Sequence, residues 1–375
     1  MPLPKKEIQS IKVTDVLPSH FSGGDTWNMA WSREGDLYTP VNDGGGFPDF
    51  DTEIFKGNRH VLMARIPQDN RGFPYIYGEN INMMDEYDIP AKITGNFNDD
   101  VAVDRVRRGA DGCTWKTSGC KMIDGALYLV AARHRYGQDC PDDPLKRQTA
   151  ENACIIKSTD KGQTWTRTAR ENYDNPMFPG RRFATPFFID YGQDGREHIV
   201  HGNNKYVYAH ANGGYWDNSD DMVLGRVLRS KIGNLDAADW QYFTGGDGMS
   251  DAAWSNHMAD AKPVIERPGK LGSTGVTYLQ QWNSYVLIGW YYPDGGGKLP
   301  GMNEHTEWEF HIAPTPWGPW RTVGEPHTFK PEGFYVPAIC SKFVNPTGKF
   351  AWAVTSGNWE NWRYYRLNMV RLVIE

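Results

Sequence analysis

The chain has 375 residues, of which 39% are hydrophobic and 23% charged, and it carries a formal net charge of −6 with a pI near 6.0. This balance supports a large hydrophobic core and excludes an extensively disordered chain. The acidic charge argues against nucleic acid as a partner, and the absence of a long apolar run predicts no membrane span.

Aromatic residues make up 13% of the chain, which also holds 40 glycines and 24 prolines, and this composition predicts many short strands joined by tight turns. The N-terminal MPLPKKEIQS has no apolar segment after its lysines, so we predict no signal peptide in this chain. The protein is then either cytoplasmic or secreted with its signal already removed. The five cysteines match no zinc or redox motif, and their disulfide state is left open.

A unit of two apolar-aromatic strands joined by a polar turn recurs five times along the chain, usually followed by a further strand. This repetition predicts an all-β fold, a five-bladed β-propeller formed by residues 1–375 as a single domain. The segment 11–17 is expected to pair with the last blade and close the ring. A β-sandwich, or two β domains, is the alternative. The five hairpins are expected at 26–41, 117–134, 184–210, 273–292 and 336–357.

One segment, STDKGQTW, matches the S-x-D-x-G-x-T-W pattern of the Asp-box hairpins found in sialidase-type propellers. In this pattern Asp160 bonds backbone N–H groups of the turn, Gly162 adopts a positive φ, and Trp165 packs against the blade. We therefore predict an Asp-box hairpin with a structural role and no part in catalysis.

The first hairpin carries an aspartate at each outer end. A register that pairs the residues flanking its turn brings Thr26 opposite Asp43 and Asp25 opposite Gly44, so the two acids become diagonal neighbours. In a propeller the open ends of the inner hairpins gather at one mouth of the central channel. Two acids there suit glycoside hydrolysis, since one protonates the leaving oxygen while the other attacks the anomeric carbon or activates water. We predict Asp25 and Asp43 as catalytic residues, although each alone also fits an ordinary turn.

The second hairpin adds a histidine to the same mouth. Its expected register places Lys116 opposite Arg133 and Trp115 opposite His134, and the flanking arginines would keep the histidine neutral as a base. We predict His134 as a third catalytic residue. Aromatic rings stack on sugars, and arginines bond hydroxyls or a sugar carboxylate. The predicted substrate-binding residues are Trp27, Trp115, Arg133, Arg135, Arg181, Arg182, His210, Trp290, Tyr291 and Tyr335.

Two alternatives stay open at this point. A polysaccharide lyase would use the arginines to neutralise a uronate carboxylate while His134 or a tyrosine such as Tyr291 removes the C5 proton in a β-elimination. A non-catalytic propeller would only bind carbohydrate. No cofactor and no catalytic metal are expected. The loop 216–221, WDNSDD, could hold a structural calcium or be an ordinary polar loop. The sugar, its linkage and the oligomeric state are left open.

Several segments together resemble one family of five-bladed propellers. They include GGDTWNMAWSREGDLYTPVNDGGGF near the start, and APTPWGPWRTV and PAICSKFVNPTGKFAWAVTSG near the end. The family is the one catalogued as domain of unknown function number 4185, and part of it is related to endo-D-arabinanases. The resemblance implies a glycan-active enzyme that uses a pair of aspartates in the N-terminal blade, which Asp25 and Asp43 match in type and position. It implies glycosidic-bond cleavage without specifying arabinan as the substrate.

Overall fold

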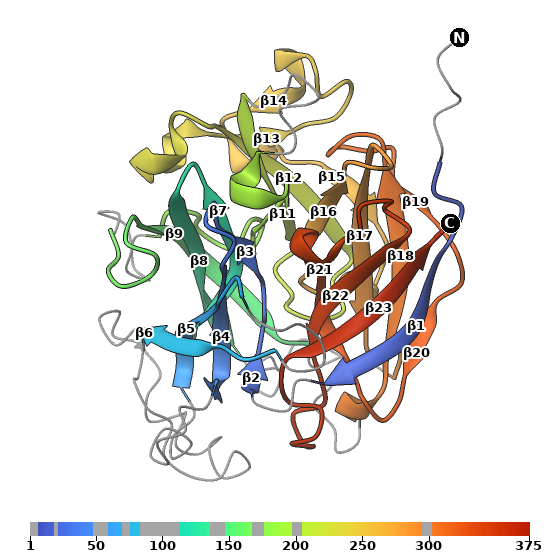
Figure 1. Ribbon diagram of the computed structural model, residues 1–375. Coiled ribbons are helices and arrows are strands. Elements are labelled where there is room, and N and C mark those ends of the chain that lie inside the picture. Colours follow the sequence, from blue (N-terminus) through green and yellow to red (C-terminus); the bar gives the residue numbers. More distant parts are fainter. Residues whose placement is uncertain are drawn as a thin grey trace.

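Five antiparallel sheets follow one another along the chain and form the blades of a five-bladed β-propeller (Figure 1). This confirms the predicted all-β propeller. The computed structural model describes residues 7–18, 22–47, 59–69, 76–82, 113–135, 147–166, 176–196, 205–294 and 302–375. Within these residues the only helices are short 3-10 turns, and none is long and apolar enough to cross a membrane.

The strands are assigned to blades in chain order. Blade 1 contains β2 (Gly23–Asp25), β3 (Ala30–Trp31), β4 (Leu37–Gly46), β5 (Arg59–Ile66) and β6 (Glu79–Asn82). Blade 2 contains β7 (Thr114–Ile123), β8 (Ala126–Arg135) and β9 (Thr149–Ser158). Blade 3 contains β10 (Phe187–Phe188), β11 (Tyr206–Asn212), β12 (Asp221–Leu228), β13 (Trp240–Phe243), β14 (Trp254–Ser255) and β15 (Pro263–Glu266). Blade 4 contains β16 (Val276–Leu279), β17 (Ser284–Tyr291), β18 (Thr306–Ala313), β19 (Arg321–Thr322) and β20 (His327–Phe329).

Blade 5 joins the two ends of the chain. It contains β21 (Tyr335–Ile339), β22 (Phe350–Ser356), β23 (Asn368–Ile374) and, on its outer edge, β1 (Ile11–Pro18). Ile11 lies opposite Ile374, and Pro18 lies opposite Asn368. Figure 1 shows the blue β1 beside the red β23. The N-terminal strand thus pairs with the last strand of the chain, which protects the edge of β23.

The inner strands start at a common end, where small polar residues tie the blades together. Asn42 donates from Nδ2 to Thr26 Oγ1 (2.8 Å) in its own blade and to the Thr117 carbonyl of blade 2 (3.0 Å). The backbone N–H of Thr26 donates to Ser356 Oγ of blade 5 (2.9 Å). These three side chains and Thr117 are buried, so the bonds hold the starts of adjacent blades in place.

The centre of the ring is filled by side chains. Lys121 of β7 lies 3.4 Å from the carboxylate of Asp190 and donates to the Met29 carbonyl (3.0 Å). The Asp190 carboxylate also accepts from the backbone N–H groups of Gly192 and Ser341. The cavity left between the inner strands is about 10 Å³, so this part of the axis is a packed core rather than a channel.

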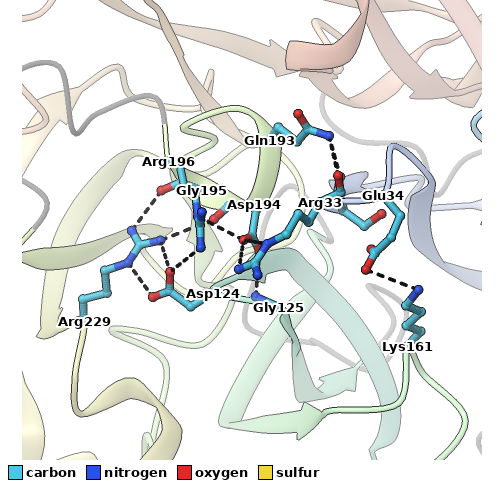
Figure 2. A network of polar contacts seen from close by, with 11 residues as sticks. Arg33, Glu34, Asp124, Gly125, Lys161, Gln193, Asp194, Gly195, Arg196 and Arg229 are labelled. Carbon is cyan, nitrogen blue, oxygen red and sulfur yellow. Dashed lines mark hydrogen bonds and ion pairs between the residues drawn. The ribbon is translucent and has the colours of Figure 1, made fainter.

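At the turn ends of blades 1 to 3, a network of charged residues joins three blades (Figure 2). Its centre is the buried Asp194 of a 3-10 turn, Gln193–Gly195. The Asp194 carboxylate accepts from Arg33 in the turn of blade 1 (2.8 Å), from the Gly125 N–H in the turn of blade 2 (2.7 Å), and from Arg196 (3.1 Å). A single carboxylate therefore fixes the spacing of three adjacent blades.

The segment predicted as an Asp-box follows β9. Asp160 Oδ1 accepts from the Thr164 N–H (2.9 Å), and Ser158 Oγ accepts from the Gly162 N–H (2.8 Å). Gly162 has a φ of 91°, and Trp165 packs against the hydrophobic core of blades 1 and 2. These contacts have the local form expected of the turn, while its assignment to the Asp-box class stays a prediction.

Candidate active site

Asp25 lies at the end of β2, at the mouth where the inner strands begin. Tyr335 of β21 donates its hydroxyl to Asp25 Oδ2 (2.8 Å), and Thr26 donates to Oδ1 (2.8 Å). Burial, and after it the nearby charge of Asp43, raise the pKa of the Asp25 carboxyl to about 6, against the opposing effects of Lys116 and the two hydroxyl hydrogen bonds. Asp25 therefore changes protonation close to neutral pH, as an acid catalyst must.

Asp43, on β4, has a different environment. Its side chain is 10% exposed and pairs directly with the ammonium group of Lys116 on β7, whose side chain is 4% exposed. A buried lysine beside a carboxylate favours the ionised form of both groups. Blade 1 thus supplies both acids, one with a pKa of about 6 and a second that is paired with a cation from blade 2.

A tyrosine from the loop after β22 touches both aspartates. Tyr365 donates its hydroxyl to the backbone carbonyl of Asp43 (3.0 Å) and lies 3.4 Å from Asp25 Oδ2. Its own carbonyl accepts weakly from the Gly24 N–H (3.5 Å). Tyr335 and Tyr365 therefore hold the Asp25 carboxylate from blade 5, while Lys116 holds Asp43 from blade 2.

Three residues of the site have unusual backbone angles. Thr26, Asp43 and Val336 have positive φ values of 64°, 51° and 50°. Positive φ is uncommon for non-glycine residues and is disfavoured most for β-branched ones such as threonine and valine. Asp43 is one of the two acids, and Thr26 directly follows the other, Asp25. Val336 follows Tyr335, which donates a hydrogen bond to Asp25. Conformations of this kind occur often at functional sites, where the surrounding structure maintains them.

Glycines allow the two aspartate segments to approach closely. A Cβ on Gly44 would lie 2.2 Å from the Gly24 Cα, and a Cβ on Gly24 would lie 2.6 Å from Val41 Cγ1. Gly24 also has a φ of 111°. Only glycine fits at these two positions, which explains why the acids are embedded in GGD and NDGGG.

Aromatic rings border Asp25 on the side of blades 4 and 5. Tyr335 lies 5.8 Å between ring centroids from both Trp290 and Trp359, and Tyr292 lies 5.5 Å from Trp290 and 6.1 Å from Trp359. The pKa of Tyr292 is raised well above its ordinary value, first by burial and then by the charges of Asp217 and Asp25. The cluster therefore lies beside the acid and keeps its own hydroxyls protonated.

The predicted base, His134, lies on β8 and is almost fully buried. Its ring meets Trp216 edge-on at 5.5 Å between centroids. The segment that carries Trp216 also carries Asp217, which accepts from the Gln148 N–H (2.9 Å), and Asn218, which exchanges two 2.9 Å hydrogen bonds with the backbone of Tyr292. This segment links blade 2 to the aromatic residues beside Asp25.

Three of the four predicted arginines have contacts with groups of this chain. Arg133 donates to the Cys113 carbonyl (2.6 Å) and lies over the ring of Trp115 (4.6 Å). Arg182 binds the carboxylate of Asp221 (2.9 Å), and Arg181 lies 3.8 Å from Glu151. Arg135, the last residue of β8, is partly exposed. The contacts of the first three arginines are with groups of this chain.

Three of the other predicted residues serve the packing. Trp27 donates from Nε1 to the Gly24 carbonyl (3.0 Å), and Trp290 donates to the Ser273 carbonyl (2.8 Å), so both indoles support segments next to the site. His210 is fully buried and bonds the Pro316 carbonyl (2.9 Å). Burial lowers the pKa of His210 to about 4, which keeps its ring neutral near pH 7.

Tyr291 lies in a separate charged cluster on blade 4. Its hydroxyl bonds Glu307 and accepts from Lys270 (3.0 Å), which also pairs with Glu309 (2.8 Å). Arg267 completes the cluster by pairing with Glu309. The charge of Asp25 instead acts on the next residue, Tyr292, whose pKa it helps to raise.

Both predicted registers at the mouth were wrong by a small shift. Asp25 lies opposite Asn42, because the register shifts between Gly23 and Asp25, where β4 has more residues than β2. In blade 2 the residue opposite Trp115 is Arg133, because β7 has a bulge between Thr117 and Cys120. A bulge inserts an extra residue into one strand, and hydrophobic alternation read from sequence does not reveal it.

Sequence reasoning also missed residues that complete the site. The register read from the sequence puts Lys116 at the mouth but gives it no role. The sequence indicates Asp217 only as part of the possible calcium loop 216–221. Tyr292 and Tyr365 were not singled out. The loop NWENWRYYR, with four aromatic residues after the last hairpin, was the available signal for Tyr365.

The loop 216–221 uses several of its polar side chains within the chain. Asp217 and Asn218 bond backbone groups, Ser219 accepts from the Gly213 N–H (3.0 Å), and Asp221 binds Arg182. Among the described residues no group of three or more histidine, cysteine or acidic side chains is placed to hold a metal ion. Calcium binding by this loop stays a prediction, which metal analysis of the purified protein would test.

The family model described as Domain of unknown function (DUF4185) matches residues 116–366 of this sequence. The chain belongs to this family. A comparison with curated proteins found no match. This membership agrees with the resemblance found in the sequence. The description of the family names no activity.

This chain is similar to a solved structure from Bacteroides ovatus ATCC 8483, with a TM-score of 0.52 and 13% sequence identity. That protein is described as a hydrolase on a provisional basis. The match covers 99% of this chain and 93% of that one. The endo-arabinase from Bacteroides thetaiotaomicron VPI-5482 is more distantly similar, with a TM-score of 0.45 and 10% identity over 97% of this chain and 98% of that one. At such identities the likeness concerns the fold alone, and the DUF4185 chain shares the propeller fold.

Proposed function

We propose that this protein hydrolyses glycosidic bonds in an oligosaccharide or polysaccharide, with Asp25 and Asp43 as the catalytic pair. The observation that carries the proposal is the contrast between the two carboxyl groups. Asp25 has a pKa of about 6, whereas Asp43 is paired with the buried Lys116. Environments that separate the protonation states of two acids are the general basis of acid and base assignment in hydrolases.

In this mechanism Asp25 is the general acid. It gives its proton to the glycosidic oxygen as the bond to the anomeric carbon breaks, and Tyr335 and Tyr365 orient its carboxyl group. Asp43 either attacks the anomeric carbon or takes a proton from the water that attacks it. Lys116 is paired with Asp43 in either case.

The aromatic residues beside Asp25 support a carbohydrate substrate. Sugar rings present C–H faces that pack on aromatic side chains, and Trp359 is the half-buried member of this cluster. The resemblance to endo-D-arabinanases makes arabinan the first polymer to test, followed by xylan.

No observation in the described residues favours the lyase alternative over hydrolysis. That mechanism needs arginines that neutralise a uronate carboxylate, but Arg133 and Arg182 are engaged with Cys113 and Asp221. The lyase and the non-catalytic binding protein are therefore kept as outcomes of the experiment below.

The test is a digestion of D-arabinan, L-arabinan, xylan and polygalacturonate, followed by reducing-sugar and ultraviolet measurements. We expect new reducing ends without ultraviolet absorbance, and a loss of at least about 100-fold in rate for Asp25→Asn and for Asp43→Asn. The matched control is Asp15→Asn, which changes an exposed aspartate of β1. Because Asp25 must be protonated, the rate should fall as the pH rises through about 6. Absorbing products would indicate a lyase, and unchanged rates in both variants would sink the proposal.

A further inference from the structure

The loop 357–367 between β22 and β23 carries a tryptophan that the mechanism above does not use. Trp362 is 73% exposed, more than any other large hydrophobic side chain among the described residues. Met249 comes next at 69%, in the loop between β13 and β14. Single exposed hydrophobic residues are common, so exposure alone assigns Trp362 no role.

The loop that carries Trp362 is anchored at several points. The Asn358 N–H donates to the Glu332 carbonyl (2.8 Å), and the N–H groups of Tyr364 and Tyr365 donate to the Asn361 carbonyl (2.9 and 3.0 Å). Asn368 Nδ2 donates to the Tyr364 carbonyl (2.7 Å). These bonds hold the exposed indole in a defined position, which lowers the entropy cost of binding a ligand there.

The same loop reaches the candidate catalytic residues on both sides of Trp362. Three residues before it, Trp359 packs against Tyr335 and Tyr292. Three residues after it, Tyr365 bonds Asp25 and the backbone of Asp43. The Tyr365 N–H donates to the Asn361 carbonyl, so the chain turns between Trp362 and Tyr365. Trp362 is therefore an exposed aromatic side chain in the same turn as the tyrosine that contacts the acid, whereas Met249 lies in a loop of blade 3.

Two arginines flank the indole. The guanidinium carbons of Arg366 and Arg363 lie 5.3 and 5.9 Å from its ring centroid. Arg366 also donates to the Trp362 carbonyl (2.7 Å). Both guanidinium groups lie over the ring, so hydrogen-bond donors stand next to the exposed indole. An aromatic ring with donors beside it suits a sugar, which has an apolar ring face and hydroxyl acceptors around it.

We propose that Trp362 is the stacking platform of an outer subsite, which binds a sugar ring of the substrate next to the units at Asp25 and Asp43. Arg363 donates to the hydroxyl groups of that ring. The inference rests on the proposed function and extends it. It assigns the protein a substrate of several sugar units rather than a single glycoside, because a monoglycoside at the acids would not reach the platform.

The experiment separates binding from cleavage. Trp362→Ala is combined with Asp25→Asn, which binds without turnover, and affinity electrophoresis is run in gels that contain D-arabinan, L-arabinan, xylan or polygalacturonate. We expect one polymer to retard the Asp25→Asn protein and the Trp362→Ala change to weaken that binding by roughly 3- to 10-fold. Trp362→Phe should retain most of the affinity. Met249→Ala is the matched control, and it should leave the affinity unchanged.

Kinetics give the second measurement. In the otherwise unchanged enzyme, Trp362→Ala should raise KM for the polymer by the same factor while its rate on a short 4-nitrophenyl glycoside stays within about twofold. Equal affinity of the Trp362→Ala and parent proteins, or no retardation of either in any gel, would overturn the inference. Trp362-dependent retardation without cleavage of any polymer would instead overturn the proposed hydrolysis and leave the sugar platform supported.

Discussion

The surroundings of the Asp25 carboxyl group determine its protonation state. Its carboxyl group is largely buried, receives hydroxyl hydrogen bonds from Tyr335 and Thr26, and lies near a second acid. Burial and a like charge both disfavour ionisation, and together they outweigh the hydrogen bonds and Lys116. A group arranged in this way serves catalysis at the expense of stability, because its charged form is disfavoured in the folded protein.

The first prediction concerns the effect of Asp25 on stability. Its folded-state pKa of about 6 exceeds the ordinary value of 3.8, so the folded protein binds the proton more tightly and loses stability as the pH rises from about 4 to 6. Asp25→Asn removes this ionisation. We expect it to increase the free energy of unfolding at pH 7 by on the order of 1–3 kcal/mol relative to wild type, and by much less at pH 4. Urea unfolding at both pH values measures this, and equal effects at the two would contradict it.

The second prediction concerns the buried pair of Asp43 and Lys116. Asp43→Asn leaves the ammonium group of Lys116 buried without its counter-charge, which should lower the free energy of unfolding by about 3–5 kcal/mol. Replacing Lys116 by methionine in the same protein should restore most of that loss. Denaturant unfolding of the single and double variants tests the pairing.

The double variant Asp43→Asn/Lys116→Met also separates folding from catalysis. If Asp43 acts in the reaction, this protein should fold and stay inactive on the polymer that the wild type cleaves. Recovery of activity together with stability would show that Asp43 serves only the structure.

At the scale of elements, the position of each blade depends on a few side chains that bond across blade boundaries. Asn42 and Thr26 do this at the mouth, and Asp194 does it at the turn ends. The bonds made by Asn42 and Thr26 join neutral groups, whereas the bonds at the turn ends join the Asp194 carboxylate to arginines. Bonds at both ends of the inner strands hold the blades at a fixed spacing, on which the geometry of Asp25, Asp43 and Lys116 depends.

The third prediction tests this arrangement at the turn ends. Asp194→Ala removes the acceptor shared by Arg33, Arg196 and the Gly125 N–H, and we expect the free energy of unfolding to fall by about 1–3 kcal/mol. Glu34→Ala in the same network removes an exposed side chain that pairs with Lys161 at 3.5 Å, and its effect should stay below about 0.5 kcal/mol. Calorimetry of both variants measures the difference, and similar effects would contradict the central place of Asp194.

At the scale of the whole molecule, the ring is closed by strands from opposite ends of the chain. β1 pairs with β23 over seven register positions, from Ile11 with Ile374 to Pro18 with Asn368. Blade 5 also supplies Tyr335 and Tyr365 to the site, so closure of the ring and orientation of Asp25 involve the same blade. A site shared by the first, second and last blades can form only when the ring is complete.

The fourth prediction follows from this closure. Removal of residues 1–18 exposes the edge of β23, and we expect Tm to fall by on the order of 5–10 °C, with greater aggregation on heating. The control is Lys12→Ala, which removes only an exposed ion pair with Glu375 and should leave Tm within about 2 °C. A truncated protein with an unchanged Tm would show that pairing between β1 and β23 contributes little to stability.

The sequence by itself determined the blades, because alternating apolar residues and turn glycines are local properties of the chain. Five repeats of strand, turn and strand were enough to predict the propeller, and GGD and NDGGG were enough to single out the two aspartates. The same local reading could not detect the irregularities in β4 and β7, which shifted both predicted registers.

Only the tertiary structure decided which groups surround the aspartates. Lys116, Tyr335 and Tyr365 reach them from other blades, and no local pattern predicts such contacts, of which those of Tyr335 and Tyr365 with Asp25 join residues more than 300 positions apart. It also showed the contacts of two predicted site residues, since His210 bonds the Pro316 carbonyl and Tyr291 bonds Lys270. Pairing within a hairpin depends on neighbouring residues, whereas the pKa of a carboxyl group depends on everything that packs around it.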